Sequence, residues 1–187
     1  MPVVTADELK AMIGQNMCTS EWLDVSQERI NQFAEATGDF QFIHVDEEKA
    51  KMTPFGGTIA HGYLTLSLIP VLTEMADYPR FANIMMALNY GSNKVRFLTP
   101  VRSGKRVRGH FKLVDLDEKR PGQWQQIVEV TVEIEGEAKP ALMAETITLI
   151  TKAISTYFGP SQAPSAARSF TSPIPPPPRS QGANSKA

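Results

Sequence analysis

Apolar and polar residues alternate most regularly between Val128 and Glu135, in the second half of the chain. Valine and isoleucine occupy every second position there, separated by glutamate and threonine. This period of two is typical of an antiparallel strand with one face on the core and the other in solvent, and it predicts a long strand over 123–135. Weaker alternation predicts further strands at residues 84–90, 94–98, 106–116 and 142–151, separated by turns at Gly91, Ser103-Gly104, Pro121-Gly122 and Gly136.

Two helices are predicted in the first forty residues. Thr5 and Glu8 have the spacing of a capping box, which opens a short helix. A second helix begins after Ser26, and Gly38 stands where a helix of that length ends. The stretch that follows, 39–60, has loop composition with one helical turn expected from Asp46.

A third helix is predicted after His61. Leucine, isoleucine and valine between residues 64 and 72 fall on nearly every face of it, which predicts a helix surrounded by protein. Pro70 is expected to kink this helix. One buried helix followed by several long antiparallel strands predicts an α+β fold in which the sheet curls around the helix.

Composition agrees with a soluble globular protein of one domain. The chain has 187 residues and a formal net charge of -1, so no overall field favours a nucleic acid or an anionic membrane as partner. Cys18 is the only cysteine, which excludes an intramolecular disulfide and fits a reducing compartment. The first twenty residues lack a secretory pattern, so we expect a cytoplasmic protein; the final Ser-Lys-Ala loosely echoes a peroxisomal signal and makes that organelle the alternative.

The domain is expected to cover residues 1–153. From residue 154 to 187 the chain is rich in proline, serine, alanine and glycine and has almost no apolar periodicity. Such a segment cannot bury enough apolar surface to offset chain entropy, so a disordered tail is predicted.

The candidate chemistry lies in the loop-rich stretch. Asp39 and His44 stand five residues apart, directly after the predicted helix end. A carboxylate and an imidazole on a constrained loop can share a water molecule, one orienting it and taking its proton while the other handles a second proton transfer. By spacing alone, a turn aspartate beside a solvated histidine is the more common arrangement.

The start of the apolar helix offers a complementary feature. His61 and Gly62 stand where its backbone N–H groups are free and the dipole is positive, which suits negative charge developing on a carbonyl oxygen. Gly62 leaves room for close approach of a substrate. Ser67, further along, is expected either to hydrogen-bond within the site or to bond its own helix. An acid/base pair with such an oxyanion site is what addition of water to an α,β-unsaturated thioester requires.

The two blocks D-F-Q-F-I-H-V-D and F-G-G-T-I-A-H-G-Y resemble the hydratase 2 motif of the MaoC-like dehydratases, the (R)-specific enoyl-CoA hydratases. The fuller text, including N-Y-G-S-N-K-V-R-F-L-T-P-V-R-S-G, is similar to the nodulation protein N branch. The resemblance covers residues 10 to 152. It implies a single hot-dog fold, a long helix wrapped by a curved antiparallel sheet, in a homodimer whose sheets run on between subunits.

The same resemblance implies a function. Asp39 and His44 match the catalytic dyad, and Gly62 matches the glycine whose N–H polarises the thioester carbonyl; His61 and Ser67 are the other expected substrate-binding residues. The substrate is an acyl-CoA thioester and the product a (3R)-3-hydroxyacyl-CoA, with no cofactor and no metal. One departure stands out, because Gln41-Phe42 replaces the Asn-Pro of many members.

Alternatives remain open at the level of the sequence. A hot-dog thioesterase would direct water to the thioester carbonyl, and a non-catalytic acyl-binding subunit would need neither residue of the dyad. Asp39, His44 and His61 also form a conceivable two-histidine, one-carboxylate metal site. The basic residues among positions 94–108 suit either CoA phosphates or a solvated sheet edge.

Overall fold

The computed structural model describes residues 2–152, and its dominant element is a six-stranded antiparallel sheet. The strands lie in the order β2-β6-β7-β8-β5, and β3 pairs with β6 beside β2. Their bounds are β2 Asn16–Thr19, β3 Leu23–Val25, β5 Ile84–Phe97, β6 Lys105–Arg120, β7 Gln123–Ile134 and β8 Leu142–Lys152. The strand predicted over 123–135 is confirmed as β7, in which every second residue is buried. The expected tail at 154–187 lies outside the described residues.

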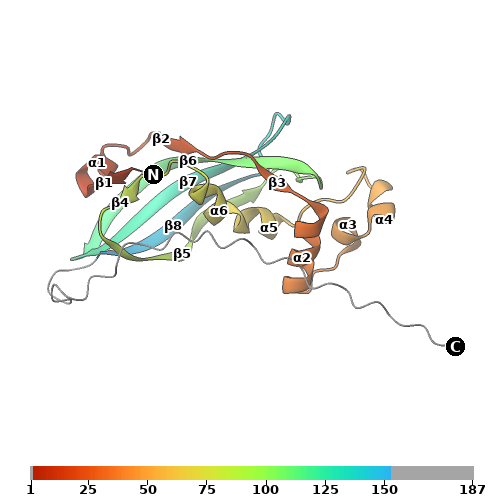
Figure 1. Cartoon of the computed structure of the whole chain (residues 1–187), viewed down its shortest axis with the longest axis horizontal. Coiled ribbons are helices and arrows are strands. Elements are labelled where there is room, and N and C mark those ends of the chain that lie inside the picture. Colours follow the sequence, from red (N-terminus) through yellow and green to blue (C-terminus); the bar gives the residue numbers. More distant parts are fainter. Residues whose placement is uncertain (1, 153–187) are drawn as a thin grey trace. The chain divides into compact units, whose positions relative to one another are not determined.

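The helices form two groups in Figure 1, one lying across the sheet and one gathered beyond its end. The first comprises α5 (Gly62–Ser67) and α6 (Ile69–Glu74), and the second α2 (Gln27–Thr37), α3 (Phe42–Val45) and α4 (Glu47–Lys51). The N-terminal α1 (Ala6–Lys10) opens with the expected capping box at Thr5, and β1 (Val3–Val4) pairs in parallel with β4 (Arg80–Phe81). Within residues 2–152, no helix has the length and apolar character that crossing a membrane requires.

The predicted apolar helix is present but is not surrounded by protein on every side. Leu68 has helical backbone angles and its N–H donates to the carbonyl of Leu64 (3.1 Å), so α5 and α6 continue one another. Leu64, Leu68 and Leu72 share one face and are buried with the inward residues of β6, β7 and β8. In contrast, Tyr63 is 69% exposed and Val71 37% exposed. The α+β hot-dog expectation is confirmed, with the sheet covering one side of the helix in the single chain.

The expected turn at Gly91 is wrong, because one continuous strand, β5, replaces the two predicted at 84–90 and 94–98. The register against β8 shifts on both sides of this glycine, between Asn89 and Gly91 and between Ser92 and Lys94. Irregularities of this kind bend a strand without ending it, and a glycine often marks them. β5 is also an edge strand in the described sheet, paired only with β8.

Candidate active site

Asp39 follows the end of α2, where the chain turns sharply. Gly38 adopts left-handed angles (φ 77°), and its N–H donates to the carbonyl of Ala34, as predicted for a helix end. One carboxylate oxygen of Asp39 accepts the backbone N–H of Gln41 at 3.3 Å, which closes a small local turn. The Asp39 side chain remains 53% exposed. Its carboxylate is thus held by the backbone of the loop and stays open to solvent and to a substrate.

His44 lies on the one-turn helix α3, which the loop composition of this stretch did not predict. Its side chain is buried (7% exposed), and its Nδ1 is 2.7 Å from the carbonyl oxygen of Ile59. A carbonyl can only accept, so Nδ1 carries the proton, and in the neutral ring Nε2 keeps its lone pair. Burial is the largest influence and lowers the pKa of His44 below its ordinary value of 6.5. The interaction with His61 acts on this pKa in the same direction, while the bond to Ile59 and the charge of Asp39 act against it.

Gln27 fixes the backbone of His44. Its side-chain amide donates to the carbonyl of His44 at 2.7 Å, and its side-chain oxygen accepts the hydroxyl of Thr58. These bonds join α2, α3 and the segment that leads to α5. Sequence reasoning missed this role, because Gln27 is 17 residues from His44 and a glutamine at a helix start carries no signal of its own.

His61 lies directly before α5 and is 3% exposed. Its Nε2 is 2.9 Å from the backbone oxygen of Asp39, so Nε2 carries the proton and the lone pair lies on Nδ1. That Nδ1 is buried and has no hydrogen-bond partner among the described residues. The ring stacks on that of His44 at 3.8 Å between centroids, and Phe33 lies at 5.0 Å from it. His61 therefore contacts both Asp39 and His44.

The three predicted residues form one cluster. A carboxylate oxygen of Asp39 and one ring nitrogen each of His44 and His61 all lie within 4.8 Å of one another. The histidine rings are stacked, with planes inclined by only 25° and centroids 3.8 Å apart, so an ion at roughly 2 Å from a nitrogen of each ring would lie well out of at least one ring plane. The arrangement suits a shared water molecule better than a metal ion.

Gly62 stands at the first position of α5, beside His44. Both line a cavity of about 220 Å³, together with Thr65, Ala141 and the segment from Phe97 to Val101. The N–H of a first helical residue has no partner within the helix. A Cβ at Gly62 would lie 3.1 Å from the ring of Phe97, which is tight. Because Gly62 has no side chain, it leaves room in the cavity beside a backbone N–H that has no partner within the helix.

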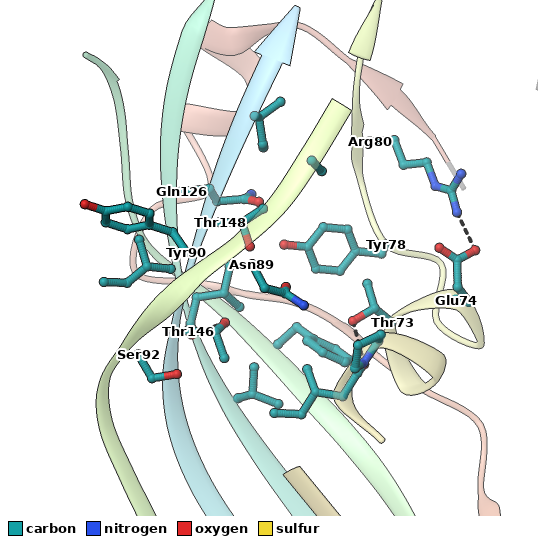
Figure 2. A pocket seen from close by; sticks show the side chains of 18 of the residues that line it. Thr73, Glu74, Tyr78, Arg80, Asn89, Tyr90, Ser92, Gln126, Thr146 and Thr148 are labelled. Atoms are coloured by element: carbon teal, nitrogen blue, oxygen red, sulfur yellow. Dashed lines mark hydrogen bonds and ion pairs between the residues drawn. The ribbon is translucent and has the colours of Figure 1, made fainter. Parts of the chain in front are cut away.

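Ser67 is not part of this cavity. Its hydroxyl donates to the carbonyl of Tyr63 at 2.7 Å, within its own helix. It lines a second cavity of about 740 Å³ at the other end of α5, between α6, β5, β7 and β8 (Figure 2). Of the predicted site residues, Asp39, His44, His61 and Gly62 are therefore brought together, and Ser67 lies apart.

The basic residues on β6 are paired with acidic residues. Arg106 forms an ion pair with Glu135, and Arg108 forms one with Glu133 at 2.7 Å. His110 also contacts Glu133, at 2.7 Å. These contacts neutralise the basic residues that lie on this strand. They favour the interpretation that the basic residues form a solvated surface of the sheet over the interpretation that they bind CoA phosphates.

Comparisons with known proteins show the family to which the chain belongs. Residues 8–138 match the family model described as MaoC like domain. The chain is 42% identical over 167 residues to nodulation protein N of Rhizobium meliloti, covering 89% of this chain and 99% of that protein. It is 47% identical over 140 residues to 3-hydroxyacyl-thioester dehydratase Z of Mycobacterium tuberculosis, covering 75% and 91%.

The solved structure of the (R)-hydratase from A. caviae shares the fold, with a TM-score of 0.59 at 22% identity, covering 71% of this chain and 93% of that one. The helix and the curved sheet define a hot-dog protein. The cluster of Asp39, His44 and His61 gives it a polar site at the start of that helix. The chain belongs to the MaoC-like family of dehydratases and hydratases.

Proposed function

We propose that the protein catalyses the reversible addition of water to a trans-2-enoyl-CoA, giving a (3R)-3-hydroxyacyl-CoA. The observation that carries this proposal is the His44 imidazole, whose Nδ1–H bond to the Ile59 carbonyl leaves the Nε2 lone pair free, in a cluster with the Asp39 carboxylate. The ligand atoms of Asp39 and His44 lie within 4.8 Å of one another, a separation that one water molecule can bridge with two hydrogen bonds of about 2.8 Å each. The relative from Mycobacterium tuberculosis supports the proposal, because dehydration of a 3-hydroxyacyl thioester is the same reaction in reverse.

In the proposed mechanism, Asp39 accepts one hydrogen of the water and orients it. Nε2 of His44 takes the other proton as the water oxygen forms its bond to the β-carbon. The electrons of the double bond move toward the thioester, whose oxygen gains negative charge. The proton on His44 then passes to the α-carbon, which restores the neutral imidazole and completes the addition of one water molecule.

Gly62 supplies the proposed oxyanion site. Its N–H belongs to the first residue of a helix that continues through α6, so it has no intrahelical partner and lies at the positive end of the dipole. A fixed N–H donor is worth most where charge develops in the transition state. The cavity that Gly62 shares with His44 gives the thioester a place between donor and base.

His61 receives a positioning role in this proposal. Its N–H holds the backbone of Asp39, and its ring supports the ring of His44 from one side. Both contacts act through the dyad. This differs from the direct substrate contact that the sequence led us to expect.

We also propose a homodimer formed through β5. This edge strand of 14 residues carries large apolar side chains that are exposed in the single chain, including Leu88 (49%) and Tyr90 (66%). A long apolar edge strand is a template for pairing with a second chain. Pairing of β5 with its counterpart about a two-fold axis would join the two sheets and cover these side chains.

Incubation with crotonyl-CoA tests the activity. Loss of the enoyl absorbance without release of free thiol is the expected result. Thiol release would show a thioesterase instead, and unchanged absorbance with tight binding of the thioester would show a non-catalytic subunit. A chelator is expected to leave the rate unchanged, because no step of the mechanism uses a metal.

A further inference from the structure

The larger cavity contains a row of polar side chains where the sheet would ordinarily present apolar ones. On β7 the inward residues are Trp124, Gln126, Val128 and their successors, and Gln126 is the polar member, buried at 5% exposure. Gln126 pairs with Thr148 on β8, which pairs with Asn89 on β5. Directly paired residues of antiparallel strands project to the same face. Gln126, Thr148 and Asn89 therefore form one row across three strands.

The neighbouring rows are less polar, which sets this row apart. On one side, Ile150 pairs with Trp124 and Ala87. On the other, Thr146 pairs with Val128 and Ser92, and its hydroxyl is already used in a bond to the carbonyl of Val128. All three members of the polar row line the cavity. Polar groups on a core-facing sheet surface cost free energy unless they find partners. Within the described residues no buried side-chain polar atom of this row lacks a partner, so the row is either bonded internally or open to the cavity, where a ligand can hydrogen-bond with it.

Tyr78 completes the group from the opposite side. It lies in the segment after α6, and its ring packs edge-on against Phe111. Figure 2 shows its hydroxyl end pointing toward Gln126, Thr148 and Asn89. Burial raises the pKa of the Tyr78 phenol well above its ordinary value, while a hydrogen bond with Gln126 lowers it in part. The hydroxyl thus stays protonated and can both donate and accept.

The larger cavity and the proposed reaction site lie along one face of the same helix. Gly62, Thr65, Leu66 and Ile69 are spaced i, i+3, i+4 and i+7, so they share one face of the helix. The first two line the small cavity beside His44, and the last two line the larger one. Seven residues of helix rise by about 10 Å. A thioester at Gly62 would therefore extend its acyl chain along this face toward the polar row.

We propose that the protein takes acyl chains that carry an oxygen function, a hydroxyl or keto group, far from the thioester, and that Gln126, Thr148, Asn89 and Tyr78 hydrogen-bond it. The inference rests on the proposed function, since it assumes that the thioester lies at Gly62. Thr148 and Tyr78 carry hydroxyls, which can donate or accept a hydrogen bond. The amides of Gln126 and Asn89 each offer a donor at one end and an acceptor at the other. Both a hydroxyl and a keto oxygen on the acyl chain therefore find a partner. An unsubstituted chain would displace water from these groups without replacing its hydrogen bonds.

Binding of saturated thioesters tests this without requiring turnover. Isothermal titration calorimetry on the full chain would compare octanoyl-, decanoyl- and dodecanoyl-CoA with their ω-hydroxy counterparts. At the length that reaches the row, the ω-hydroxy compound is expected to bind about tenfold more tightly. Equal or weaker binding of the ω-hydroxy compound at every length would overturn the proposal.

Variants locate the effect. Gln126→Leu and Thr148→Val remove hydrogen-bonding groups at nearly constant size, and each is expected to bring the ratio of the two dissociation constants close to one. The ratio is insensitive to the fraction of protein that is folded, because both ligands are measured on the same sample. Gln125→Leu and Thr151→Val, on the opposite face of the same strands, should leave it as in the wild type. A ratio that Gln126→Leu and Thr148→Val leave unaltered would also overturn the proposal.

Hydration of crotonyl-CoA separates this inference from the proposed function. That short chain does not extend to the polar row, so its turnover reports on Asp39, His44 and Gly62 alone. Turnover without a binding preference would refute the substrate class and keep the hydratase. A binding preference without turnover would refute the hydratase and keep the cavity as an acyl-binding site.

Discussion

The imidazole rings of His44 and His61 stack with their centroids 3.8 Å apart and their planes inclined by 25°. Each ring donates one N–H to a backbone carbonyl, His44 to Ile59 and His61 to Asp39. The two contacts set the tautomers, so that His44 presents its Nε2 lone pair and His61 keeps its own lone pair on the buried Nδ1. In the proposed mechanism these tautomers make His44 the base and His61 its support.

The dyad makes the first prediction. Asp39→Asn and His44→Gln should each lower kcat/KM for crotonyl-CoA at least about a hundredfold, because a positioned acid or base contributes that much or more. His110→Gln is the matched control, since His110 contacts Glu133 on β6 and β7, and its rate should equal that of the wild type. Full activity in either dyad variant would contradict the assignment.

The pH dependence follows from the lowered pKa of His44. The residue is a base only while neutral, so kcat/KM should fall on the acid side with an apparent pKa below 6.5. The sign for stability is the same: a histidine whose folded pKa is depressed contributes stability above pH 6.5 and loses it as the pH falls through the folded value. Rates with crotonyl-CoA and urea unfolding across the same pH range would test both. An acid limb above 6.5 would contradict this.

His61 can be tested by keeping its ring and removing its nitrogens. In His61→Phe the stacking on His44 is retained, while the bond to the Asp39 carbonyl is lost. We expect kcat/KM to fall about tenfold. The acid limb should move upward, because His61 contributes to lowering the pKa of His44. A purely structural residue would change the yield or melting temperature and leave the pH profile in place.

Gly62 and Phe97 form a pair suited to a double-mutant cycle. Gly62→Ala places a Cβ about 3.1 Å from the Phe97 ring, within the cavity that holds the proposed oxyanion donor. The variant should lose activity and roughly 1–3 kcal/mol of unfolding free energy, as overpacking does. Adding Phe97→Leu should recover most of the stability. If the effects of the two substitutions on stability and on rate were simply additive, the close contact between Gly62→Ala and Phe97 would have no energetic consequence, against this prediction.

The proposed dimer predicts a change of mass in solution. Leu88→Lys with Tyr90→Lys places like charges on β5 of both copies, which should shift the protein from dimer to monomer in light scattering coupled to gel filtration. Glu129→Lys on the central strand β7 is the control and should leave the dimer intact. A monomeric wild-type protein would contradict the proposal.

The local elements could be predicted because each depends on residues close in sequence. The capping box at Thr5, the helix that begins after Ser26 and ends at Gly38, and the alternation along β7 need only backbone geometry and periodicity. The motif that contains Asp39 and His44 was likewise legible, since its spacing and the glycine that follows resemble a known family.

Tertiary packing decided everything that depends on partners distant in sequence. Gly91 continues a strand because β8 pairs with both of its flanks, whereas the local signal of a glycine was for a turn. The tautomer of His44 depends on Ile59, 15 residues away, and the role of His61 depends on the backbone of Asp39, 22 residues away. Sequence alone thus determined which residues are candidates for the chemistry, and the fold decided which nitrogen of each histidine keeps its lone pair, because a hydrogen bond is set by contact in space.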